Sequence, residues 1–159
     1  MKKSFLVLAI AFFSSVVIAN AKGTTEVPKN ISVAFTAKYP SAEIKSWRTA
    51  KGEYIAEFVL EKKKYRAYYS SDAEWLRTET KIKSSTKLPG QVREALHKSE
   101  YASWYITEMK QIEKPGKNVY AIHVNDGNKL SADHHDAVKT DFLLYFSDSG
   151  ELIKKQRIH

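Results

Sequence analysis

The chain has 159 residues, no cysteine, and a formal net charge of +8 from 26 basic and 18 acidic residues. The lack of thiols excludes cysteine nucleophiles, cysteine–metal sites and disulfides, so stability has to come from an apolar core. The positive charge favours anionic partners, but no arginine-rich helix or zinc pattern indicates nucleic-acid binding.

The N-terminal residues have the three-part layout of a secretory signal peptide. Lys2 and Lys3 precede an apolar run over 5–18, which is followed by a small-x-small cleavage site at 19–21. The apolar run is shorter than the roughly 20 residues that span a bilayer. We therefore predict that 1–21 is a signal peptide and that the protein is periplasmic or secreted, with no membrane span after cleavage.

Two segments have the same helical spacing of apolar residues, each next to a proline that suits the start of a helix. The first has Val27, Ile31, Ala34 and Phe35 beside Pro28, and the second has Leu88, Val92, Ala95 and Leu96 beside Pro89. Pro40 is expected to end the first helix.

Alternating apolar and polar residues predict four strands after each helix, at 42–49, 53–60, 64–71, 74–83, 103–112, 118–125, 140–147 and 151–158. The turn residues 71–73 correspond to 148–150, and 125–139 is an insertion. We therefore predict an α+β protein of two tandem repeats, 22–86 and 87–159. Each repeat would be a helix followed by a four-stranded antiparallel meander.

The sequence resembles the PepSY-like, β-lactamase-inhibitor-like proteins of bacterial envelopes. The matching elements, in chain order, are Val27-Pro28, Ala34-Phe35, Tyr39-Pro40, Trp47, Gly52, Tyr54 to Phe58, Trp75-Leu76, Thr78-Glu79, Leu88-Pro89 and 147–152. The resemblance implies two helix-plus-four-strand units whose sheets combine into one curved surface with the helices on one face. It also implies that the other face grips a protein partner. Two departures are Ala73, where a turn glycine is usual, and the 125–139 insertion.

The residues indicate no enzyme and no cofactor. The sequence has no Gly-x-Ser-x-Gly, His-Glu-x-x-His or phosphate-binding glycine loop. The cluster at 133–136, with His134 and His135, contains metal-ligating residue types. Neighbouring loop residues point in different directions, however, so a solvated loop is the favoured interpretation. A metal- or small-ligand-responsive sensor remains an alternative.

The aromatic residues lie mostly on predicted strands. If the helices cover the face with Tyr54, Phe58, Tyr65, Tyr69, Phe142 and Phe146, strand alternation places another set on the opposite face. The predicted binding residues in that second set are Arg66, Tyr68, Trp75, Arg77 and Tyr145. These residue types are enriched at binding hot spots, although they could also simply cover an open sheet.

We therefore expect a non-enzymatic binding module that contacts an envelope or secreted protein partner through an exposed aromatic and basic sheet face, and the positive charge favours an anionic partner. The alternative is an inhibitor of a secreted hydrolase, either a β-lactamase or a protease.

Overall fold

The computed structural model describes residues 26–127 and 140–158 of the chain. Its elements are α1 (Lys29–Lys38), β1 (Glu43–Ala50), β2 (Glu53–Leu60), β3 (Lys63–Tyr69), β4 (Trp75–Lys81), the 3-10 turn η1 (Ser85–Lys87), α2 (Gly90–Lys98), β5 (Tyr105–Lys114), β6 (Lys117–Asn125), β7 (Asp141–Ser147) and β8 (Leu152–Ile158). The eight predicted strands are each confirmed to within two residues. The predicted signal peptide and the 133–136 cluster lie outside the described residues.

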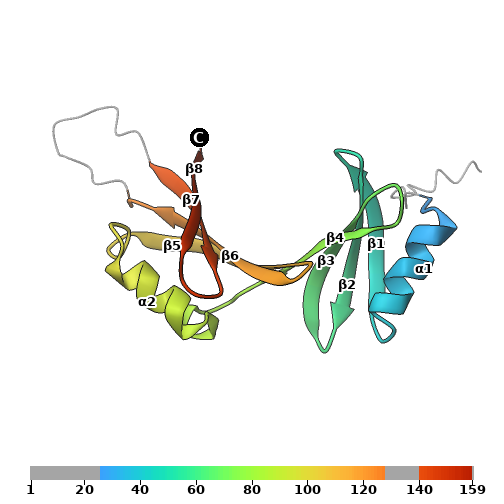
Figure 1. Cartoon of the computed structure of the whole chain (residues 1–159), viewed down its shortest axis with the longest axis horizontal. Helices are drawn as coiled ribbons and strands as arrows, with labels where there is room; N and C mark the ends of the chain where they lie inside the picture. Colours follow the sequence, from blue (N-terminus) through green and yellow to red (C-terminus); the bar gives the residue numbers. More distant parts are fainter. Residues whose placement is uncertain (1–25, 128–139, 159) are drawn as a thin grey trace, which may run out of the picture.

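The strands form one antiparallel sheet in the order β1 to β8, so each strand pairs with its neighbours in sequence. The middle pair is β4–β5, in register from Thr78 opposite Glu113 to Lys81 opposite Lys110. Just beyond this register the amide of Ile82 donates to the carbonyl of Met109 at 2.9 Å. Main-chain hydrogen bonds therefore continue through the centre of the molecule (Figure 1).

The predicted fold class, α+β with two tandem helix-plus-four-strand repeats, is wrong. Over residues 26–127 and 140–158 the structure is mostly β, with a single eight-stranded sheet and two short α-helices of 10 and 9 residues. The physical reason is the β4–β5 ladder, which joins strands about thirty residues apart into one sheet. Hydrophobic periodicity reports only which residues of a segment face the core, so it could not reveal this long-range pairing.

Helix α1 packs on one end of the sheet through Ile31 and Phe35, which are 0% and 1% exposed. The ring of Phe35 contacts those of Phe58 and Trp47, with centroid distances of 5.1 and 5.5 Å. The helix ends at Lys38, and the amide of the next residue, Tyr39, donates to the carbonyl of Phe35 at 2.9 Å before Pro40 prevents further helix.

Helix α2 packs on the other end of the sheet (Figure 1). Its buried residues Val92 and Leu96 join a cluster with Ile122, Leu144 and Phe146 from β6 and β7. The cores under α1 and α2 lie on the same face of the sheet. Thr78 of β4 contacts Tyr39 on the α1 side, and its cross-strand partner Glu113 of β5 lies on the same face. Met109, four residues before Glu113 in β5, also lies on that face and belongs to the core under α2. The predicted helix-covered aromatic set is confirmed on this face.

Two hairpin turns, β3–β4 and β7–β8, share a serine-capped hydrogen bond. The Ser70 hydroxyl accepts from the amide of Glu74, and the Ser147 hydroxyl accepts from that of Glu151, both at 3.1 Å. The residue with positive φ is Ala73 in the first turn, at 64°, and Gly150 in the second, at 84°. A side chain fits only the first turn, because a Cβ at Gly150 would lie 2.5 Å from the carbonyl oxygen of Gln91 in α2.

Among the described residues, no helix is both long and apolar enough to cross a membrane.

Candidate binding face

The sheet face opposite the helices, here called the helix-free face, has an apolar centre. Ile112, Val119 and Ala121 form a buried cluster on β5 and β6, and Leu143 and Tyr145 of β7 pack against it. The three central residues are 4–9% exposed, although neither α1 nor α2 covers them. Neighbouring side chains therefore shield them, and the partly buried Leu143 and Tyr145 present the accessible apolar surface.

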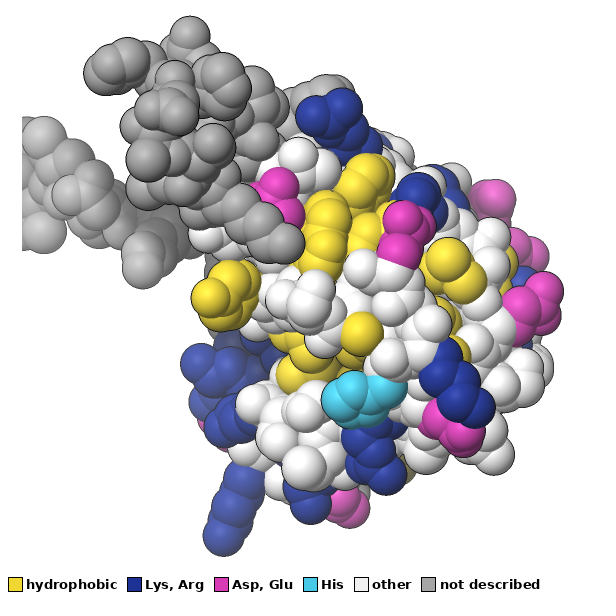
Figure 2. Space-filling view, turned by 90° about the vertical axis from the view of Figure 1, so that its left-hand side faces the viewer, with side chains coloured by type: hydrophobic (Ala, Val, Ile, Leu, Met, Phe, Trp, Pro, Cys, Tyr) yellow, Lys and Arg dark blue, Asp and Glu magenta, His cyan; other side chains and the backbone are white. Residues whose placement is uncertain are grey.

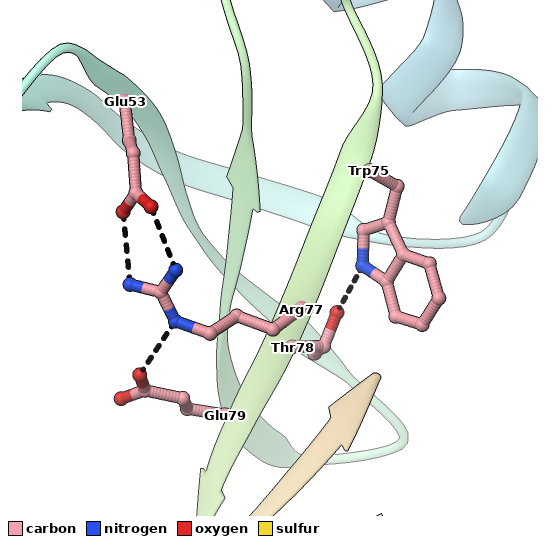
Figure 3. A network of polar contacts seen from close by, with 5 residues as sticks. All are labelled: Glu53, Trp75, Arg77, Thr78 and Glu79. Carbon is pink, nitrogen blue, oxygen red and sulfur yellow. Dashed lines mark hydrogen bonds and ion pairs between the residues drawn. The ribbon is translucent and has the colours of Figure 1, made fainter. Parts of the chain in front are cut away.

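Arg77 of β4 forms the main polar contacts of this face (Figure 3). Its guanidinium donates two hydrogen bonds to the carboxylate of Glu53, at 2.8 and 2.9 Å, and a third to Glu79 at 3.3 Å. The same guanidinium lies 3.7 Å from the ring centroid of Tyr68. One side chain thus joins β2, β3 and β4 through a bidentate ion pair and a cation–π contact.

The contacts around Arg77 shift the pKa values of the groups that surround it. Hydrogen bonding from Arg77 lowers the pKa of Glu53 below its usual range, and hydrogen bonding to Glu53 raises the pKa of Arg77. The pKa of the Tyr68 hydroxyl is raised, first by burial and then by the charge of Glu79. Burial and Glu79 also raise the pKa of Tyr145. Both tyrosines are therefore neutral donors at physiological pH.

The predicted binding residues divide between the two faces. Arg66, Tyr68, Arg77 and Tyr145 lie on the helix-free face, but Trp75 does not. Trp75 packs against the α1 core, donates to the Thr78 hydroxyl at 2.9 Å and has the Lys38 ammonium 3.5 Å from a ring centroid.

The placement of Trp75 on the helix-free face was wrong because β4 contains an irregularity. Tyr68 pairs with Arg77, whereas the next residue, Tyr69, pairs with Trp75, so Leu76 is an extra residue without a partner. An extra residue reverses the faces of the side chains beyond it. Figure 3 shows the outcome, with Arg77 and Trp75 extending to opposite sides of β4.

The helix-free face is less exposed and less basic than the sequence predicts. Tyr68 is only 7% exposed, beneath Arg77. Arg66 contacts Glu57 at 3.0 Å, and Lys110 contacts Glu108 at 3.1 Å. The cations nearest the apolar centre are therefore paired with carboxylates.

The predicted binding set did not include the carboxylates Glu53 and Glu79 or the histidine end of the face. His123 Nε2 lies 3.5 Å from Asp141 Oδ1, and a shallow pocket there is bordered by His123, Glu108 and Tyr145. The cross-strand register supplies these partners, so no local signal in the sequence could have paired them. Within the described ranges, no group of three or more His, Asp or Glu side chains is placed to hold a metal ion.

Apolar side chains also reach the surface at the end of the sheet near α2 and β5. Tyr105 and Ile106 at the start of β5 are 67% and 38% exposed, and Leu152 and Ile153 of β8 are also exposed. Figure 2 looks at this end of the molecule and shows hydrophobic side chains between basic and acidic ones.

Comparison with known proteins identifies the family. The family described as "Putative beta-lactamase-inhibitor-like, PepSY-like" matches residues 52–154, more than half of the chain. No curated protein matches the sequence.

Similar solved structures include a BLIP-like protein from Bacteroides fragilis, with 25% identity and a TM-score of 0.72 over 86% of this chain and 89% of that one. Another, from Bacteroides eggerthii, has 24% identity and a TM-score of 0.71 over 84% of this chain and 91% of that one. The latter is described as periplasmic, which agrees with the location predicted from the sequence. The sequence-based resemblance is thus confirmed, and the chain belongs to the PepSY-like, β-lactamase-inhibitor-like family.

Proposed function

We propose that this protein is a non-enzymatic periplasmic binding protein whose helix-free face contacts a protein partner. The observation that carries the proposal is the apolar centre of that face. Tyr145 and Leu143 lie half-buried over the Ile112–Val119–Ala121 cluster, with ion pairs around them. An apolar, aromatic centre with a polar rim is the usual anatomy of a protein interface.

The predicted residues then have different roles in binding. Tyr145 contributes apolar contact area, and Arg66 and Arg77 contribute to the charged rim. Tyr68 supports the Arg77 guanidinium from below and has little surface of its own. Because the rim contains paired charges of both signs, the preferred partner presents a mixed polar rim around an apolar anchor rather than a uniformly acidic surface.

Site-specific photo-crosslinking in the periplasm tests this proposal. A photoreactive residue at Leu143 or Tyr145 should give a discrete crosslinked protein, whereas one at Val33, which is 59% exposed on α1, should not. Tyr145→Ala should reduce the yield from position 143 by about tenfold if Tyr145 is a hot spot. Equal adducts from positions 33 and 143 would contradict the proposal, because contact would then be independent of the face.

A second candidate function is inhibition of a secreted hydrolase. It is favoured by the family description and by the likeness to the BLIP-like protein. Purified protein added to a panel of β-lactamases and proteases at micromolar concentration should then slow at least one of them. Arg77→Ala should weaken that inhibition, and no slowing anywhere in the panel would count against this function.

A further inference from the structure

The helix-covered face is left open between α1 and α2, which lie at opposite ends of the molecule (Figure 1). A groove with a volume of about 660 Å³ lies over this middle region. Its floor comes from β3, β4 and β5, including Thr80 and Gln111, and its borders include Lys63, Lys83 and Lys87. We call it the lysine groove. Its size falls within the range of ligand-binding clefts.

The positive charge of this groove is only partly neutralised, because Lys81, which also borders it, is paired with Glu108 at 2.7 Å. Within residues 26–127 and 140–158, none of Lys63, Lys83 and Lys87 forms an ion pair, and all three are exposed. The one carboxylate that borders the groove, Glu113, is already paired with Lys38 of α1 at 3.6 Å. On the helix-free face, by contrast, Arg66, Arg77 and Lys110 are each paired with a glutamate.

Concentrated, unpaired positive charge in a hollow raises the local concentration of anions. From the grouping of these three unpaired lysines around one groove we infer that the lysine groove binds an acidic, extended segment of a protein partner. The inference goes beyond the proposed function, because it concerns the opposite face of the sheet and a different ligand chemistry.

The lysines themselves favour a chain of carboxylates over a single phosphate. They come from three separate segments, the start of β3, the link after β4, and η1. Ammonium groups on separate segments suit carboxylates spaced along an extended chain, although lysine by residue type binds carboxylate and phosphate alike. Thr80 and Gln111 on the floor add polar groups. Ile82 and Tyr65, the hydrophobic residues that border the groove in the described part of the chain, are both partly buried, so neither is a fully exposed anchor for a lipid bilayer.

Fluorescence anisotropy with a labelled octaglutamate peptide tests the inference on the whole mature protein. The wild type should bind octaglutamate at least tenfold more tightly than octaglutamine. The triple variant K63E/K83E/K87E should lose at least tenfold in affinity. The control K29E/K51E/K154E changes the net charge equally at exposed positions outside the groove and should lose less than about twofold, because salt screens distant charges.

The milder variant K63Q/K83Q/K87Q provides a second readout if charge reversal disturbs folding, and it should also lose affinity several-fold. Equal losses in the groove and control variants would overturn the inference, since binding would then follow net charge alone. The groove variants could instead lose binding to phosphatidylglycerol vesicles or dextran sulfate while their octaglutamate binding stays unchanged. That result would also overturn the inference and would assign the groove to a lipid or a polysaccharide.

Discussion

The guanidinium of Arg77 lies 3.7 Å from the ring centroid of Tyr68, directly across the β3–β4 ladder. The same group forms a bidentate pair with Glu53 on β2, so three adjacent strands are linked through one side chain. Arg77 is 26% exposed and Glu53 is 28% exposed, which places the pair between surface and core. The helix-free face is therefore held in shape by polar contacts, as well as by its apolar centre.

Removal of Arg77 should destabilise the fold. Arg77→Ala leaves Glu53 and Glu79 without their shared partner and uncovers Tyr68, so we expect a loss of about 2 kcal/mol in the free energy of unfolding. The control Arg66→Ala removes a more exposed pair with Glu57 and should cost about 0.5 kcal/mol or less. Urea denaturation measures both. Equal effects of the two substitutions would show that the Arg77 network is only a surface feature.

Glu53 should make stability depend on acid pH. Because Arg77 lowers its pKa in the folded state, Glu53 contributes fully above the ordinary carboxyl pKa of about 4.3, and that contribution is lost as pH falls through the lowered value. Screening at a partly exposed site limits the contribution to about 1 kcal/mol. Glu53→Gln should therefore reduce the stability lost between pH 7 and pH 3, as measured by denaturation at each pH. An unchanged pH dependence in the variant would exclude this linkage.

The two serine-capped turns should respond oppositely to alanine–glycine exchange. Ala73 has a φ of 64°, so Ala73→Gly should relieve left-handed strain and stabilise the protein by about 0.5 kcal/mol. Gly150→Ala should cost at least about 2 kcal/mol, because the new Cβ would also press against the Gln91 carbonyl in α2. Thermal melts of both variants test this. A neutral Gly150→Ala would mean that α2 can move away from the turn.

The aromatic cluster under α1 should dominate the stability of that end of the sheet. Phe35 is 1% exposed and contacts Phe58, Tyr39 and Trp47, so Phe35→Ala should cost about 4 kcal/mol through lost burial and a cavity. Val33 on the same helix is 59% exposed, and Val33→Ala should change stability by less than about 0.5 kcal/mol. Chemical denaturation compares the two. A small effect at Phe35 would show that α1 contributes little to folding.

Much of the candidate site was predictable residue by residue. Tyr65 and Arg66 point to opposite faces of β3, as their alternation predicts, and Arg66, Tyr68, Arg77 and Tyr145 share the helix-free face. Trp75 broke the pattern because Leu76 is inserted without a partner, and one extra residue reverses every face beyond it. The pairing of Arg77 with Glu53 was not predictable, because it depends on a register between strands 24 residues apart.

The sequence by itself determined where the strands and helices lie, because helical and strand periodicities are local properties of the side chains. Its motifs also identified the family, through the order of short elements along the chain. Only the tertiary structure decided that β4 and β5 join the strands into one eight-stranded sheet, and that Lys63, Lys83 and Lys87 gather around one groove. Those properties depend on backbone hydrogen bonds and cross-strand neighbours between distant residues, which a one-dimensional pattern does not encode.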